Sequence, residues 1–273
     1  MRDRLVLALL ALCLLDVQAQ TLRIGVLPYL SPRTLLLQFA PLRDFLQEEL
    51  HQAVEIQTAP DLPRFLARTH RGDFDLVISA PHFARLAQTT HDFLPLVAIR
   101  ADFYALLFVP KHSAAATLGA LRGKTLHLPH RLSFVSFQIE DFLRQRGLNP
   151  ERDLRLLYYS TDNNAILATE QGRDDAGAAQ RSVFENMPGS ITAQLRIVGS
   201  TQSAVSLVLL AHPRLAATSL PAIRSSLLKF PYSEPGLRFF QASHSEFIPS
   251  DAAMMAKLDI YLPRLTARLA QAP

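Results

Sequence analysis

Three polar side chains that could hold an anion lie close together near the start of the chain. Tyr29, Ser31 and Arg33 occupy a proline-containing loop between the apolar run 22–26 and a helical pattern. An arginine guanidinium can make two parallel hydrogen bonds to an oxyanion, and hydroxyl groups can add single ones. Because open α/β sheets bind ligands at the carboxyl ends of their strands, we expect this loop to face a ligand. The alternative for Arg33 is a solvated surface position.

The remaining candidates follow other predicted strands or begin predicted helices. They are the polar residues Ser79, His82, Tyr104, Ser133 and Asp162. We expect Ser79 and His82 to line a cleft at the end of a buried strand, and Tyr104 to face the same cleft from a segment between two strands. Ser133 and Asp162 are also good N-cap residues, so helix capping is the alternative role for both. His82 could instead simply start a helix, and Tyr104 could pack in the core.

The sequence lacks the motifs of common enzymes and metal sites. It contains no P-loop, no G-x-G-x-x-G and no G-x-S-x-G motif, each of which positions a reactive group or a phosphate. The nine histidines show no metal-ligand spacing. The net charge of +4 comes without a run of Lys and Arg, which argues against nucleic-acid binding. We therefore predict a protein with no enzymatic activity, no cofactor and no metal.

The first residues follow the three-part plan of a secretory signal. Two arginines within the first four residues precede the apolar run 5–15, and Val-Gln-Ala then predicts cleavage after Ala19. The apolar run is much shorter than the roughly 20 residues that a membrane-spanning helix needs. We predict that residues 1–19 are a signal peptide and that the mature protein is periplasmic. The alternatives are a membrane anchor and a lipoprotein start at Cys13, the only cysteine.

Most of the remaining chain alternates short apolar runs with amphipathic helical patterns. Such a βαβ rhythm predicts α/β architecture, with helices on both faces of a largely parallel sheet. The rhythm is interrupted at 94–109 and at 195–210, where two apolar strands follow one another closely. A helix, a Gly-x-x-Asp turn and a strand also occur twice, around Gly72–Asp75 and Gly172–Asp175. This repetition suggests two similar α/β lobes, although Gly-Asp turns are common.

Six segments, in order along the chain, resemble the phosphate/phosphite/phosphonate-type periplasmic substrate-binding proteins of ABC transporters. These segments are IGVLPY (24–29), PLRDFL (41–46), DLVISAP (75–81), LGALRGKT (118–125), DAGA (175–178) and FIPSD (247–251). No single segment is specific, and their order and coverage carry the resemblance.

The resemblance implies a two-lobed, type II periplasmic-binding-protein fold. Its two doubly wound mixed sheets are joined by two crossover strands and close on a ligand like a hinged clamp. We expect lobe one to comprise residues 20–102 plus 206–273, and lobe two residues 103–205. The two strand pairs that interrupt the βαβ rhythm suit the crossovers.

The family's anion-binding turn is altered in this sequence. In the family, a Ser-Thr-Ser-Gly-type turn begins a helix of lobe two, and its hydroxyl and N–H groups converge on the phosphoryl oxygens. The corresponding stretch here, 130–136 (HRLSFVS), lacks the glycine and retains Ser133. Asp162 stands where the family often has a histidine, and Ser79 replaces an aromatic residue. The resemblance therefore implies the clamp and leaves specificity for phosphonates open.

We predict a periplasmic solute-binding protein that captures a small polar anion, phosphonate-like, phosphate-like or another oxyanion, for an ABC importer. Each hydrogen bond lost from the anion-binding turn should cost about 1.5–3 kcal/mol, so we expect simple phosphonates to bind less tightly than is usual in the family. A sensor that reports its ligand to a membrane histidine kinase, a binder of zwitterions and, more weakly, an enzyme on the same scaffold remain alternatives. We expect a monomer whose partners are the small ligand and either the permease or the kinase.

Overall fold

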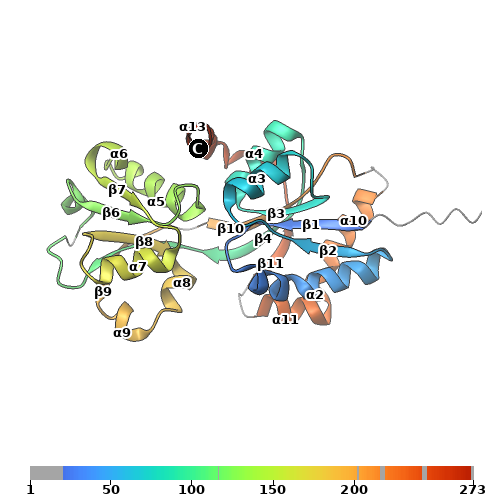
Figure 1. Cartoon of the computed structure of the whole chain (residues 1–273), viewed down its shortest axis with the longest axis horizontal. Coiled ribbons are helices and arrows are strands. Elements are labelled where there is room, and N and C mark those ends of the chain that lie inside the picture. Colours follow the sequence, from blue (N-terminus) through green and yellow to red (C-terminus); the bar gives the residue numbers. More distant parts are fainter. Residues whose placement is uncertain (1–20, 116, 202, 216–218, 242–244, 272–273) are drawn as a thin grey trace, which may run out of the picture.

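The apolar runs of the sequence form the strands of two separate sheets in the computed structural model (Figure 1). The structure describes residues 21–115, 117–201, 203–215, 219–241 and 245–271. The predicted signal peptide, residues 1–19, lies outside these ranges. Within them, no helix is both long enough and apolar enough to cross a membrane.

The first sheet combines strands that lie far apart in the sequence. Its strand order is β11-β4-β10-β3-β1-β2. The strands are β1 (Leu22–Val26), β2 (Val54–Gln57), β3 (Leu76–Ser79), β4 (Leu94–Phe103), β10 (Ser203–Ala211) and β11 (Glu246–Pro249). β1 pairs in parallel with β2 and β3, whereas β10 runs antiparallel to β3 and β4.

Helices cover both faces of this first sheet (Figure 1). They are α2 (Pro32–Leu50), α3 (Leu62–His70), α4 (Pro81–His91), α10 (Ser219–Lys229) and α11 (Glu234–Gln241). Helix α2 packs with α10 and α11, while α3 and α4 lie on the opposite face. The helical spacing in α2 buries Leu35, Phe39, Leu42 and Leu46 completely, and burial of each such side chain stabilises the fold by about 1.5–3 kcal/mol. The helix continues through Pro41.

The second sheet is built from the middle of the chain. Its order is β7-β6-β8-β5-β9. The strands are β5 (Ala105–Pro110), β6 (Thr125–Leu128), β7 (Arg155–Tyr158), β8 (Ala176–Gln180) and β9 (Leu195–Ser200). Its helices are α5 (Phe134–Gln145), α6 (Pro150–Asp153), α7 (Asp162–Glu170), α8 (Arg181–Glu185) and α9 (Gly189–Thr192). β6 pairs in parallel with β7 and β8, and β5 runs antiparallel to β8 and β9.

Two strand pairs carry the chain between the sheets. β4 ends in the first sheet and β5 begins in the second after the single residue Tyr104, while β9 returns the chain to β10. These crossovers lie in the two interruptions of the βαβ rhythm. The predicted class, two mixed α/β sheets joined by two crossover strands, is confirmed. The two bodies are called lobe one and lobe two below.

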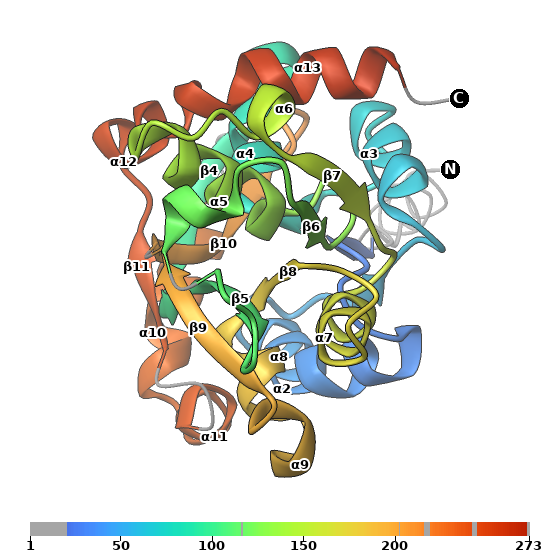
Figure 2. The same ribbon diagram turned by 90° about the vertical axis from the view of Figure 1, so that its left-hand side faces the viewer.

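The C-terminal helices reach both lobes. Helices α12 (Ala252–Ala256) and α13 (Leu262–Ala270) pack against α4 of lobe one, and Figure 2 shows α13 at the top of the molecule over α4 and α5. Arg268 donates to both carboxylate oxygens of Glu140 in α5, each at 2.7 Å, and Arg264 donates to one of them at 3.0 Å. Glu140 is fully buried, and removing a partner from a buried ion pair costs about 3–5 kcal/mol. Helix α13 therefore ties lobe two to lobe one.

Candidate functional site

The carboxyl ends of several strands in each lobe point toward the other lobe. In lobe one, β4 leads to the second sheet, and β3 runs in the same direction because β10 is antiparallel to both strands. In lobe two, β9 leads back to the first sheet, and β8 runs with it because β5 is antiparallel to both. Strand-end loops are where open α/β sheets bind ligands. Here the strand-end loops of the two lobes therefore face each other across one boundary. This boundary is called the seam below.

One half of this seam is closed by side chains. His82, the second residue of α4, is 0% exposed, and its Nε2 lies 3.0 Å from the carbonyl oxygen of Leu132 in lobe two. Its ring lies 5.2 Å from that of Phe134 and 5.0 Å from that of Phe137. Burial lowers the pKa of His82 to about 3, so the imidazole is neutral and Nε2 carries the proton donated to Leu132. Ser79, at the end of β3, is buried as well.

The hydroxyl groups at the start of α5 are used within the lobe. Ser133 caps the helix, because its Oγ accepts a hydrogen bond from the backbone N–H of Ser136 at 3.2 Å. The Ser136 hydroxyl is fully buried and lies 3.2 Å from the carbonyl oxygens of both Pro129 and His130, which share its single hydrogen. At this helix start, which resembles the family's anion-binding turn, the hydroxyl groups are thus bonded to the protein's own backbone.

Asp162 joins a helix to a strand end. Its Oδ1 accepts a hydrogen bond from the backbone N–H of Gln180 at 2.7 Å. Burial raises the pKa of the Asp162 carboxyl group, and the backbone hydrogen bonds partly oppose that effect. The alternative role for Asp162, capping of α7, was wrong: Thr161 is the N-cap, since its hydroxyl oxygen accepts from the N–H of Asn164 at 3.3 Å. Asp162 is the first residue inside the helix.

The loop that leads into α2 remains open to solvent. Tyr29 is 43% exposed, and Ser31 and Arg33 are exposed as well. Ser31 caps α2 by accepting a hydrogen bond from the N–H of Thr34 at 3.3 Å. The polar groups of this loop are accessible to solvent, whereas those on the α4–α5 side of the seam are buried.

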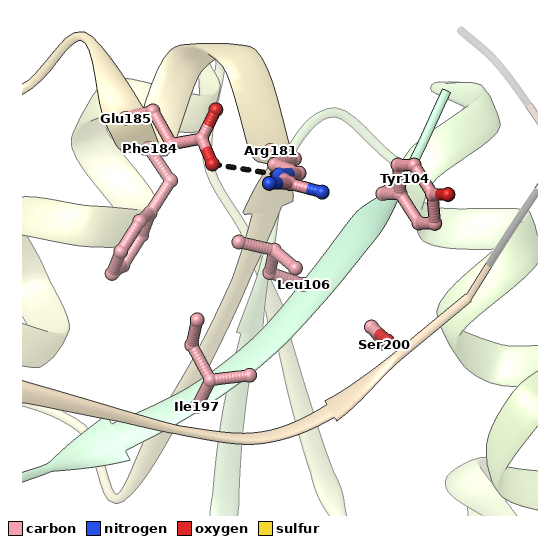
Figure 3. A pocket seen from close by; sticks show the side chains of 7 residues that line it. All are labelled: Tyr104, Leu106, Arg181, Phe184, Glu185, Ile197 and Ser200. Carbon is pink, nitrogen blue, oxygen red and sulfur yellow. Dashed lines mark hydrogen bonds and ion pairs between the residues drawn. The ribbon is translucent and has the colours of Figure 1, made fainter. Parts of the chain in front are cut away.

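Lobe two contributes a pocket of about 360 Å³ at its end nearest the crossovers (Figure 3). The pocket is lined by Tyr104, Leu106, Arg181, Phe184, Glu185, Ile197 and Ser200. Arg181 forms an ion pair with Glu185 at 2.6 Å, and its guanidinium carbon lies 5.3 Å from the centre of the Tyr104 ring. Tyr104 thus lines an opening beside the first crossover strand.

Arg181 is the site candidate that the sequence analysis missed. It directly follows β8, the strand after the second Gly-x-x-Asp turn. When the two repeats are aligned on Gly72 and Gly172, Arg181 matches Pro81, and each of the two residues begins a helix, so comparing the repeats would have identified it. Among the described residues, no group of three or more His, Cys, Asp or Glu side chains could hold a metal ion.

The comparisons with known proteins agree with this architecture. Residues 24–255 match the family model of the phosphonate periplasmic substrate-binding proteins of ABC transporters. Because the match covers most of the chain, the protein belongs to this family. Proteins of the family bind a small molecule and work with an ABC permease.

Three solved structures illustrate the fold. XAC2383 from Xanthomonas citri, bound to chloride ion, has a TM-score of 0.78 and 21% identity, covering 91% of this chain and 99% of its own. PhnD1 from Prochlorococcus marinus, in complex with methylphosphonate, has a TM-score of 0.74 and 18% identity, covering 93% and 100%. The aliphatic sulphonate binding protein SsuA from Escherichia coli has a TM-score of 0.66 and 17% identity, covering 89% and 92%. At these identities the likeness establishes the fold alone.

Proposed function

We propose that this protein captures a small organic anion in the open half of the seam and delivers it to an ABC permease. The observation that carries the proposal is the position of Arg181, which follows β8 at the strand-end rim of lobe two and lines a pocket with Tyr104. Arg33 lies beyond the opposite rim, in the first turn of α2. Guanidinium groups can bind oxyanions in a bidentate manner, and closure of the lobes strengthens such contacts by excluding water.

The residues of the seam divide between two proposed roles. Tyr29, Ser31, Arg33 and Tyr104 contact the ligand together with Arg181. Ser79, His82, Ser133 and Asp162 support the seam behind it, since their side chains are buried or bonded within the protein. The ligands of the structural relatives favour an anion: methylphosphonate in PhnD1, chloride and ATP in XAC2383. We also propose that binding is not followed by chemistry.

Calorimetry on the purified mature protein tests the proposal. The probes are methylphosphonate, phosphate and methanesulfonate, with 2-aminoethylphosphonate and glycine as zwitterions. A ligand at 100 times its dissociation constant should also stabilise the fold by about 2.7 kcal/mol. We expect at least one of the first three anions to bind, and recovery of the unchanged ligand. Binding of glycine alone, or of none of the five probes, would reject an organic-anion binder.

Two arginine variants and a matched control locate the site. Losing a charged hydrogen-bond donor costs about 1.5–3 kcal/mol, so Arg33→Gln and Arg181→Gln should each weaken anion binding by roughly tenfold to a hundredfold. Arg238→Gln is the control, because Arg238 forms an ion pair with Glu234 four residues away in α11, as Arg181 does with Glu185. Equal binding by all three variants would place the anion elsewhere.

We further propose that the protein is exported through cleavage after Ala19 and acts as a monomer. The N-terminal sequence of the periplasmic form should then begin at Gln20, and sedimentation should give the mass of one chain. A deletion strain that cannot grow on the bound anion, yet responds normally to it in transcription, indicates transport. The opposite result indicates a partner kinase.

A further inference from the structure

The pocket of lobe two has an apolar floor and a polar rim (Figure 3). Leu106 of β5 and Phe184 of α8 are nearly buried, at 6% and 8% exposure, whereas Ile197 of the edge strand β9 is 50% exposed. Leu106 and Phe184 belong to a small core beneath the sheet, so their positions are fixed by packing. Ile197 forms a wall that is open to solvent and could be covered by a ligand.

The polar rim of the pocket faces the crossovers. Tyr104 precedes β5, Arg181 follows β8 and Ser200 ends β9. The backbone N–H of Arg181 donates to the carbonyl oxygen of Tyr104 at 2.8 Å, which holds the two residues side by side. A molecule in the pocket would therefore meet a guanidinium, a phenol and a hydroxyl at one end and aliphatic and aromatic carbon at the other.

We propose that this pocket receives the apolar substituent of the anion, so that the protein prefers alkylphosphonates and alkylsulfonates of several carbons over inorganic phosphate or methylphosphonate. The inference rests on the proposed function, since it assumes that the anionic group meets Arg181. The volume of about 360 Å³ lies at the lower end of the range for small-molecule pockets, about 300–1,000 Å³. A methyl group would leave most of it unfilled.

Glu185 gives the pocket a built-in competitor for the ligand. Its carboxylate contacts the Arg181 guanidinium at 2.6 Å, and both side chains are about half exposed. An exposed ion pair of this kind contributes little stability, typically less than about 1 kcal/mol, so an incoming oxyanion can displace the carboxylate. A phosphonate or sulfonate must also overcome the repulsion from Glu185. The two members of the pair should therefore have opposite effects on binding: removing the charge of Arg181 weakens it, and removing the charge of Glu185 strengthens it.

The test is calorimetry with methyl-, propyl- and hexylphosphonate. For the wild type we expect the affinity to rise about fourfold for each added methylene, the change that corresponds to about 0.8 kcal/mol per buried CH₂. Ile197→Ser should lower hexylphosphonate binding at least fivefold more than it lowers methylphosphonate binding. Ile197 is half exposed, so this variant should fold, as equal circular dichroism would verify.

The ion-pair variants complete the experiment. We expect Arg181→Gln to weaken and Glu185→Gln to tighten the binding of every phosphonate, with Arg238→Gln and Glu234→Gln as controls on α11. Affinity that does not depend on chain length, or a chain-length effect in Ile197→Ser that is as large as in the wild type, would overturn the pocket assignment while leaving anion capture intact. If none of the three phosphonates and no alkylsulfonate binds to any form of the protein, the proposed function fails as well.

Discussion

The two lobes contain one turn with the same pattern of hydrogen bonds. Gly72 and Gly172 both have positive φ, +74° and +67°, and each donates its N–H to a threonine carbonyl three residues earlier, at 2.9 and 3.1 Å. The aspartate three residues later then accepts from a backbone N–H of the neighbouring strand: Asp75 from Arg23 at 2.8 Å, and Asp175 from Thr125 at 2.9 Å. The Gly-x-x-Asp repetition in the sequence thus marks equivalent positions in two related lobes.

The lobes differ in which strand-end loop they bury. In lobe one the loop after β3 is buried with His82, and the loop after β1 is exposed with Ser31. In lobe two the arrangement is reversed: the turn after β6 buries Ser136, and Arg181 after β8 is exposed. The buried loops contact each other through His82 and Leu132. Two of these four loops therefore join the lobes, and the other two remain exposed to solvent.

The largest expected difference between the repeats concerns their aspartates. Asp75 is 6% exposed, and Arg214 donates to its Oδ1 through two nitrogens at 3.0 and 2.8 Å. Asp75→Ala should lower the free energy of unfolding by about 3–5 kcal/mol, because a buried ion pair and a backbone acceptor are lost together. Asp175 is more exposed and pairs with Lys124 at 3.4 Å, so Asp175→Ala should cost about 1–2 kcal/mol.

Urea unfolding followed by circular dichroism measures both variants. The Asn variants at the two positions serve as controls, because the amide oxygen can still accept the backbone hydrogen bond. If the two Ala variants lose the same free energy of unfolding, the loss comes from the turn that both lobes share and not from the ion pair in lobe one.

The second prediction concerns the histidine that lobe two lacks. His82 corresponds to Ser182 when the lobes are aligned on their glycines, and burial lowers its pKa to about 3 from 6.5. Between these pH values the unfolded chain binds more protons than the folded one. The contribution of His82 to the free energy of unfolding is therefore fully present above pH 6.5 and is lost as the pH falls toward 3. Through His82 alone, the free energy of unfolding should fall by about 2 kcal/mol between pH 7 and pH 5.

Comparison with a His82→Gln variant isolates this contribution. Burial also lowers the pKa of His127 and His130, which adds to the acid sensitivity of both proteins equally. Urea unfolding at pH 7, 6 and 5 should therefore give a shallower dependence for the variant. Identical slopes would mean that His82 reaches water without unfolding.

Much of the fold was predictable because its signals are local. Apolar runs, helical spacing at Leu35 to Leu46 and the Gly-x-x-Asp turns each report on a few neighbouring residues, and the structure contains the corresponding elements. The strand pairs that interrupt the rhythm predicted the crossovers for the same reason. The bridging role of α13 was not predictable, since the contacts of Arg264 and Arg268 with Glu140 join residues more than a hundred positions apart.

The site was harder to predict, because the residue types at the end of a strand do not show whether their side chains are buried. Ser31 and Ser133 look alike in the sequence, and both cap helices. His82 carries a suitable donor, but it is buried by Phe134 and Phe137, which come from the other lobe. Arg181 gave no local signal, and only its register with Pro81 in the repeat identifies it. Which of these residues remain exposed depends on which loops contact each other across the seam, and this is decided only when the two lobes pack together.

The third prediction uses the two turn glycines. An L-residue in the left-handed region costs roughly 1–2 kcal/mol, so Gly172→Ala, whose added Cβ would meet nothing within 4 Å, should lose about that amount. At Gly72 the Cβ would also lie 2.7 Å from Nε2 of His212. Gly72→Ala should therefore lose more, by up to about 1 kcal/mol of packing strain. Thermal unfolding of the two variants side by side decides this, and a larger loss at Gly172 would contradict it.

The last comparison concerns the two serine caps, whose losses should differ by only about 1 kcal/mol. Replacing a serine N-cap by alanine typically costs about 1 kcal/mol. In Ser31→Ala, water can solvate the released N–H of Thr34, because that turn is exposed. In Ser133→Ala, the N–H of Ser136 is left in a buried turn, so the loss should reach the upper end of the range, about 2 kcal/mol.

Anion binding should rank the same two variants in the opposite order. If the open half of the seam holds the ligand, Ser31→Ala weakens methylphosphonate binding severalfold, while Ser133→Ala leaves it within about twofold of the wild type once both proteins are fully folded. Calorimetry at low temperature keeps both folded. Because the two serines make the same capping bond, stability cannot account for such a reversal. If instead Ser133→Ala alone weakens binding, the anion lies at the start of α5, and that buried turn must open to admit it.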